Sequence, residues 1–97
     1  MPRFRVLIEG SGLELPGDFA GVSSQTVRGF FVARVVNAPD RKQAADRVLA
    51  IIADDWRNGA FTSLGVRPTL RVAESRPATL LEWLRPKGTG YAFHPGQ

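Results

Sequence analysis

Few side chains of this chain could perform catalysis, because it contains no cysteine and a single histidine. His94 could act as a general base only beside a group that orients its ring, and the sequence around it shows no such group. The lack of cysteine removes thiolate nucleophiles and cysteine-ligated zinc. We therefore predict no catalytic residue and no cofactor, and an enzyme that uses His94 is kept only as a second alternative.

Two further motifs have the residues of a functional site without its spacing. Gly10-Ser11-Gly12 is not followed by the Lys-Ser/Thr pair of a phosphate loop or by the third glycine of a nucleotide site, so it predicts a turn. Asp54 and Asp55 are adjacent, and on a helix they would point about 100° apart. The other acidic residues show no ligand pattern, so no metal site is predicted.

The arginines are the feature that favours a function. Lys and Arg together number 13 against 9 Asp and Glu, which gives a net charge of +4 and favours acidic partners. Alternation along the expected strands, with the helix on the opposite side, puts seven candidate binding residues on one open sheet face: Arg3, Arg5, Arg28, Phe30, Arg34, Arg67 and Arg71. A shift of one residue in strand register would exchange the two faces.

Three interpretations of this face remain open. In the first, long arginine stems cover apolar neighbours and keep their charged ends in water. In the second, the face contacts a protein partner or a second copy of the chain, since aromatic residues and arginine are enriched at interfaces. In the third, single-stranded nucleic acid stacks on the aromatic residues. We favour protein contact, because exposed apolar patches more often mark protein interfaces.

The strands that would position these residues are predicted from alternating and β-branched residues. Pro68 cannot donate to a strand ladder, so it marks the start of the third strand. Residues 10–26 are rich in Gly and Ser and are expected to form a long connection. The expected strands span residues 3–9, 27–36, 69–74 and 88–94.

One amphipathic helix is predicted over residues 39–57, where apolar residues recur at helical spacing up to Trp56. Asn58-Gly59 is a fitting helix end. A second, short helix is expected to open at Ser75-Arg76-Pro77 and to end at Pro86. The predicted core comprises Val6, Ile8, Phe31, Val35, Val48, Leu49, Ile52, Trp56, Leu70 and Val72.

These elements predict a single α+β domain over residues 1–97. It is a two-layer sandwich in which the main helix packs on a three- to four-stranded, mostly antiparallel sheet. Only three apolar residues in a row precede Glu9, which is too short for a signal peptide, and no stretch is long enough to span a membrane. Together with the lack of cysteine, this favours the cytoplasm.

The run from Gly29 to Asp40, followed by Ala44-Ala45 and by the late stretch from Gly90 to Pro95, resembles a group of small uncharacterised bacterial proteins. Members share a Gly-Phe-aromatic strand that carries an arginine and a late Gly-aromatic-x-aromatic strand. The resemblance covers about half the chain. It implies that the last segment completes the sheet, and it implies no particular function.

Overall fold

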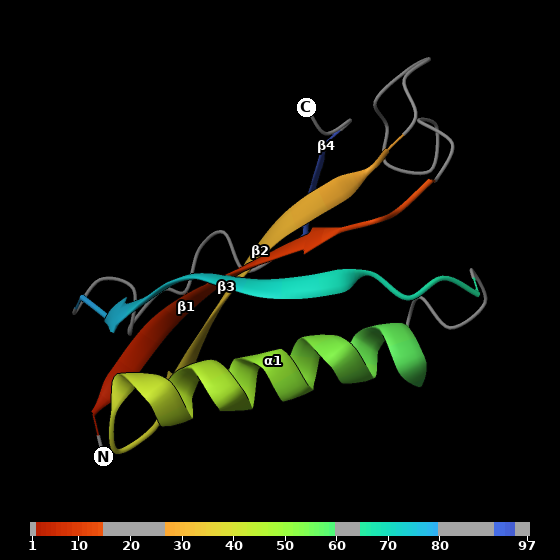
Figure 1. The fold of residues 1–97 in the computed structure, drawn as a ribbon. Helices are drawn as coiled ribbons and strands as arrows, with labels where there is room; N and C mark the ends of the chain where they lie inside the picture. Colours follow the sequence, from red (N-terminus) through yellow and green to blue (C-terminus); the bar gives the residue numbers. More distant parts are fainter. Residues whose placement is uncertain (1, 15–26, 60–64, 80–90, 95–97) are drawn as a thin grey trace.

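A four-stranded antiparallel sheet with one helix packed on it is the architecture of residues 2–14, 27–59, 65–79 and 91–94, which the computed structural model describes (Figure 1). This confirms the predicted α+β class. The elements are β1 (Arg3–Ser11), β2 (Gly29–Asn37), α1 (Arg41–Arg57), β3 (Thr69–Pro77) and β4 (Ala92–His94).

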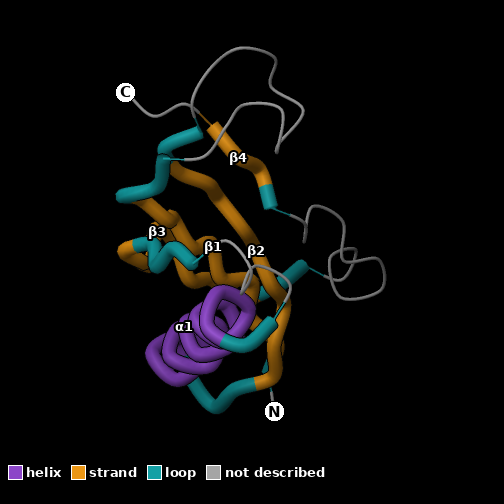
Figure 2. Tube along the Cα trace, turned by 90° about the vertical axis from the view of Figure 1, so that its right-hand side faces the viewer, coloured by secondary structure: helices purple, strands orange, loops and turns teal. Residues whose placement is uncertain are grey.

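The N-terminal strand occupies the interior of the sheet, whose order is β3-β1-β2-β4. β1 pairs antiparallel with β2 on one side and with β3 on the other. β2 and β3 therefore run parallel to each other on either side of β1. Figure 2 shows α1 against one face of this sheet; we call that side the helix-side face and the other the open face.

Alternation along β1 follows the prediction. Phe4, Val6 and Ile8 are buried, whereas the residues between them are half-buried. Burial of these side chains against α1 supplies the main stabilisation, at about 25 cal/mol per Å² of apolar surface. The strand is longer than predicted, because it continues through Gly10 to Ser11.

The faces of β2 are the reverse of the predicted ones. Directly paired residues of antiparallel strands share a face, and Gly10 pairs with Phe30 while Glu9 pairs with Phe31. Phe30 is fully buried on the helix-side face, and Phe31 is 36% exposed on the open face. The expected core positions of Phe31 and Val35 are therefore wrong. β2 is apolar on both faces, so its composition does not show which face points inward.

α1 begins two residues later than predicted and ends where predicted. The Asp40 side chain caps it by accepting a hydrogen bond of 2.8 Å from the Gln43 backbone N–H. At the other end, the Asn58 backbone N–H donates to the Asp54 carbonyl. No helix in the described residues is long and apolar enough to cross a membrane.

β3 starts directly after Pro68, as predicted, but it continues as a strand through Pro77. The expected helical opening at Ser75-Arg76-Pro77 is therefore wrong. The Ser75 hydroxyl donates to the Arg41 carbonyl of α1 at 3.0 Å, and this contact holds the end of the strand against the start of the helix. The rest of the expected second helix, residues 80–86, lies outside the described residues, as do residues 15–26 and 88–90.

Candidate functional site

The structure divides the seven predicted binding residues among three places. Arg3, Arg5 and Arg71 lie on the open face, where the register pairs Arg71 with Glu9. Arg34 pairs with Val6, which puts Arg34 on the helix-side face together with Phe30. The prediction that all of these residues share an open face is therefore wrong for Arg34 and Phe30.

Arg28 and Arg67 lie outside the strands, so strand alternation does not place them on either face. Arg28 comes directly before β2, and Arg67 comes two residues before β3. Both residues are exposed. The second strand was expected to start at residue 27, two residues before β2 does, and Arg67 was assigned to the open face by continuing the alternation past Pro68.

Arginines of the open face form ion pairs with carboxylates of the same face, which the sequence did not indicate. Arg71 Nη2 lies 2.8 Å from Glu9 Oε1, and Arg76 Nε lies 2.9 Å from Glu74 Oε1. Arg76 was not among the predicted binding residues, because it was assigned to a helix. Two arginines of this face thus already have carboxylate partners, which weakens its attraction for an acidic ligand.

Arg34 belongs to a partly buried polar cluster with Asp55 and Tyr91. Its guanidinium lies 3.9 Å from Asp55 Oδ2 and 5.7 Å from the centre of the Tyr91 ring. The Tyr91 hydroxyl donates to Asp55 Oδ2 at 2.8 Å. The cluster ties the segment before β4 to α1 and β2, and Arg34 stabilises the fold there.

Tyr91 is expected to ionise only well above the pH at which a free tyrosine does. Burial, followed by the hydrogen bond to Asp55 and its negative charge, raises the pKa of Tyr91 far above the ordinary value of 10.0. Since the unfolded chain loses this proton first, the stability that Tyr91 contributes is present below pH 10 and is lost as pH rises towards the folded-state pKa. Tyr91 is the single tyrosine, so the ultraviolet absorbance of tyrosinate reports on it alone.

Two variants test this assignment. Tyr91→Phe should reduce stability at neutral pH by about 0.5–1.5 kcal/mol and should remove the tyrosinate transition. Asp55→Asn retains an acceptor without the charge, and we expect it to lower the pKa of Tyr91 in the folded protein. A tyrosinate transition near pH 10 in the folded wild-type protein would contradict the cluster.

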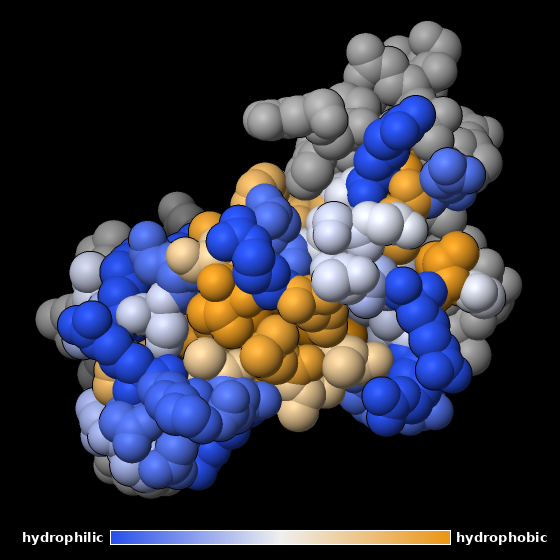
Figure 3. Space-filling view, viewed as in Figure 1, coloured by the Kyte–Doolittle hydropathy of each residue, from blue (hydrophilic) through white to orange (hydrophobic). Residues whose placement is uncertain are grey.

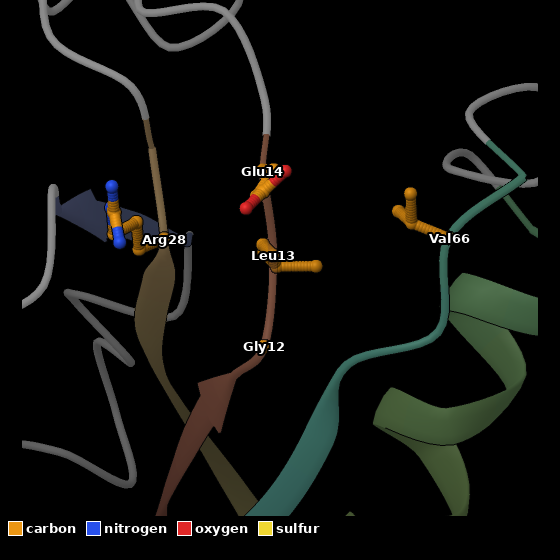
Figure 4. Close-up of a pocket in the computed structure, with 5 residues that line it drawn as sticks. All are labelled: Gly12, Leu13, Glu14, Arg28 and Val66. Carbon is orange, nitrogen blue, oxygen red and sulfur yellow. The ribbon is translucent and has the colours of Figure 1, made fainter.

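A shallow hollow of about 570 Å³ lies beside the end of β1 (Figure 4). It is lined by Gly12, Leu13, Glu14, Arg28 and Val66. Figure 4 shows Leu13 and Val66 extending towards each other across it, with the charged ends of Glu14 and Arg28 at its rim. These residues offer one carboxylate and one guanidinium and no nucleophile beside a base, so they define no reaction.

Metal and histidine chemistry gain no geometric support. Among the described residues, no group of three His, Cys, Asp or Glu side chains could hold a metal ion. The backbone of His94 lies in β4 opposite Gly29. An enzyme that uses His94 therefore stays an untested hypothesis.

The surface with the clearest binding character lies between α1 and β3. Figure 3 shows a continuous hydrophobic area there. β3 is the edge strand on this side of the sheet. Partly buried apolar residues of both elements lie on this side, and we call them the α1–β3 surface: Ala45, Leu49, Leu70 and Val72.

A signal for this surface is present in the sequence of α1. Residues 48–53 are six consecutive apolar residues, yet only Val48 and Ile52 among them are buried. Leu49, the residue of this run on the side of β3, is half-buried, and Ile51, on the other flank, is 43% exposed. Such a run widens the apolar face of an otherwise amphipathic helix, which is typical of a helix segment that is covered on more than one side. The regular spacing of the core-facing residues Ala44, Val48, Ile52 and Trp56 already accounts for a helix packed on a sheet, so the run alone does not identify a second contact surface.

The placement of side chains around α1 separates two flanks. Arg47 donates to the Asn37 carbonyl and Asp55 meets Arg34, so both residues face β2. Ile51, one turn from each of them, lies on the same flank. Leu49 lies on the other flank, beside β3.

Comparison of the chain with protein-family models, with curated proteins and with solved structures finds no match, so the resemblance to small bacterial proteins stays a prediction.

Proposed function

We propose that this chain is a non-enzymatic protein-binding module that contacts its partner through the α1–β3 surface. One observation supports this most strongly: the hydrophobic area between α1 and β3 borders the edge strand β3 (Figure 3). Contiguous, partly exposed apolar area beside an open strand edge is a typical protein-contact surface. The lack of cysteine suits a reducing compartment, and we propose the cytoplasm as the place of action.

Two kinds of contact are available at this surface. Further covering of Leu49, Leu70 and Val72 contributes about 25 cal/mol for each Å² removed from water. The outer side of β3, which has no strand beside it among the described residues, offers backbone groups for an added strand. Apolar contact supplies affinity, and strand addition sets the orientation of the partner.

The open face supports the same function less well. In the part of the chain that the structure describes, the exposed aromatic residue of this face is Phe31, because Phe30 is buried beneath α1. Arg71 forms an ion pair with Glu9. The nucleic-acid alternative therefore has less aromatic surface for stacking and less unpaired positive charge for phosphates than expected. If this alternative holds, fluorescence anisotropy should show binding of single-stranded DNA that weakens steeply with salt.

Site-specific photo-crosslinking tests the proposed surface. A photoreactive phenylalanine analogue is placed at position 53, one helical turn after Leu49 on the same flank, and in a second chain at position 31 on the open face. Both chains are expressed in cells and illuminated. We expect a discrete protein adduct from position 53, and we expect excess wild-type chain to compete it away while a Leu49→Lys chain does not.

The position-31 chain is the matched control for reagent and expression level. An adduct from position 31 alone would move the contact to the open face and contradict the proposed surface. The absence of any competed adduct from position 53, in a chain whose circular dichroism shows it to be folded, would contradict the proposed function itself.

A further inference from the structure

Resting on the proposed function, we infer that the partner at the α1–β3 surface is a second copy of this chain, joined through antiparallel pairing of β3 with the partner's β3. The two-fold axis passes between Val72 and Ala73, perpendicular to the sheet. The four-stranded sheets then form one continuous sheet, with both copies of α1 on the same side.

The register follows from an irregularity in β3. The pairing of β1 with β3 shifts between Leu7 and Ile8, which pair with Glu74 and Val72. Ala73 is therefore an extra residue, a bulge. Because of it, Arg71 and Glu74, three residues apart, share the open face, whereas in a regular strand they would lie on opposite faces.

A two-fold axis perpendicular to the sheet keeps each face on its own side, so paired residues must share a face. Because of the bulge at Ala73, residues on the two sides of it pair with residues of the same face when the axis lies between Val72 and Ala73. Arg71 then lies opposite Glu74 of the second copy, and Leu70 lies opposite Ser75, both on the helix-side face. The small side chain of Ala73 lies at the axis, where two copies approach most closely.

Charge complementarity selects this register. Each dimer gains two Arg71–Glu74 cross-strand pairs, related by symmetry. Arg71 and Glu74 already pair with Glu9 and Arg76 of their own chain, but their side chains are 65% and 49% exposed, so each can add a contact to a second copy. Moving the axis by one residue, to lie between Ala73 and Glu74, would place Arg71 opposite Arg76 of the partner and bring like charges together.

The helix-side face is complementary as well. α1 runs alongside β3 in the opposite direction (Figure 1). The two-fold axis therefore brings the two copies of α1 together as antiparallel neighbours, each with Leu49 towards the other. Ala45, one turn earlier on the same flank, is small enough to allow close approach, and Leu70 and Val72 lie between the helices and the sheet. This is the area that Figure 3 shows as hydrophobic.

Charge reversal tests the register directly. Arg71→Glu and Glu74→Arg each place two like-charged pairs across the axis, so each variant alone should raise the dimer dissociation constant about tenfold or more. In an equimolar mixture, a chain of each kind restores two opposite-charge pairs, and the mixed dimer should form. The double variant Arg71→Glu/Glu74→Arg should also form a dimer. Sedimentation equilibrium of the full chain at low salt measures all four.

Arg67→Glu is the control, because it makes the same charge change at an exposed residue outside β3; its dissociation constant should equal that of the wild type. Circular dichroism verifies that each variant is folded. A wild-type chain that stays monomeric, or a dimer that both single variants preserve, overturns this inference, as does a mixture that fails to associate. A competed adduct with another protein at position 53 would then leave the proposed function standing.

Discussion

Replacement of Phe30 by alanine is expected to lower the free energy of unfolding by about 3–5 kcal/mol, the range typical of large-to-small changes at fully buried aromatic residues. Phe30 stacks on Trp56, with ring centres 5.3 Å apart, and meets the edge of Tyr91 at 5.0 Å. Its removal leaves a cavity between α1 and the sheet. Urea unfolding followed by circular dichroism measures the loss, and Phe30→Leu provides a milder variant if the alanine chain does not fold.

Phe31→Ala is the matched control for this change, because it removes the same side chain one residue along the strand. Phe31 is 36% exposed on the open face, so its replacement should cost less than about 1 kcal/mol. Equal costs at the two positions, or a larger cost at Phe31, would show that the register of β2 is shifted by one residue.

Gly10→Ala is expected to destabilise the fold by about 1–3 kcal/mol or more, because the added methyl group has no room. A Cβ atom at Gly10 would overlap the ring of Phe30, its partner across β1 and β2. That ring cannot move easily, since Trp56 stacks on it. The same unfolding measurement reports the effect.

A double-mutant cycle separates this overlap from a general intolerance of β1. Gly10→Ala combined with Phe30→Leu should cost less than the sum of the two single changes, with a coupling of about 0.5–3 kcal/mol. Ser11→Ala, at the exposed neighbouring residue, should change stability by less than about 0.5 kcal/mol. Simple additivity in the cycle would mean that Gly10 and Phe30 do not interact.

The buried faces of β1 and α1 were predictable from the sequence, because the spacing of their apolar residues fits only one face. β1 alternates Phe4, Val6 and Ile8 with more polar residues, so its buried face follows from its own composition. α1 has a helical repeat that ends at Trp56 and a capping aspartate at its start. Local signals of this kind need no knowledge of the rest of the chain.

The buried face of β2 was predicted wrongly, because its sequence pattern has two interpretations. With Phe30 and Phe31 adjacent, both faces of the strand look suitable for a core, and only pairing with β1 decides between them. Arg34 lies on the helix-side face, where its charge is stabilised by the Asp55 carboxylate of α1 and by the Tyr91 ring. Contacts between residues so far apart in sequence have no local signature.

The candidate site was missed for a related reason. Leu49 was expected in the core, but it lies at the margin of α1, where no described element covers it completely. β3 was expected to end before Ser75, because Pro77 resembles a helix start. Its extension and its bulge, which align Arg71 with Glu74, depend on pairing with β1.

The interior position of β1 also has a consequence for synthesis. The strand is made before the strands on its two sides, which come from residues 29–37 and 69–77. Until residue 77 has emerged, a nascent chain has one side of its first strand open to other chains. Pairing on both sides of β1 must therefore wait until residues 69–77 have been made, and a chain terminated just after the helix would be prone to aggregation.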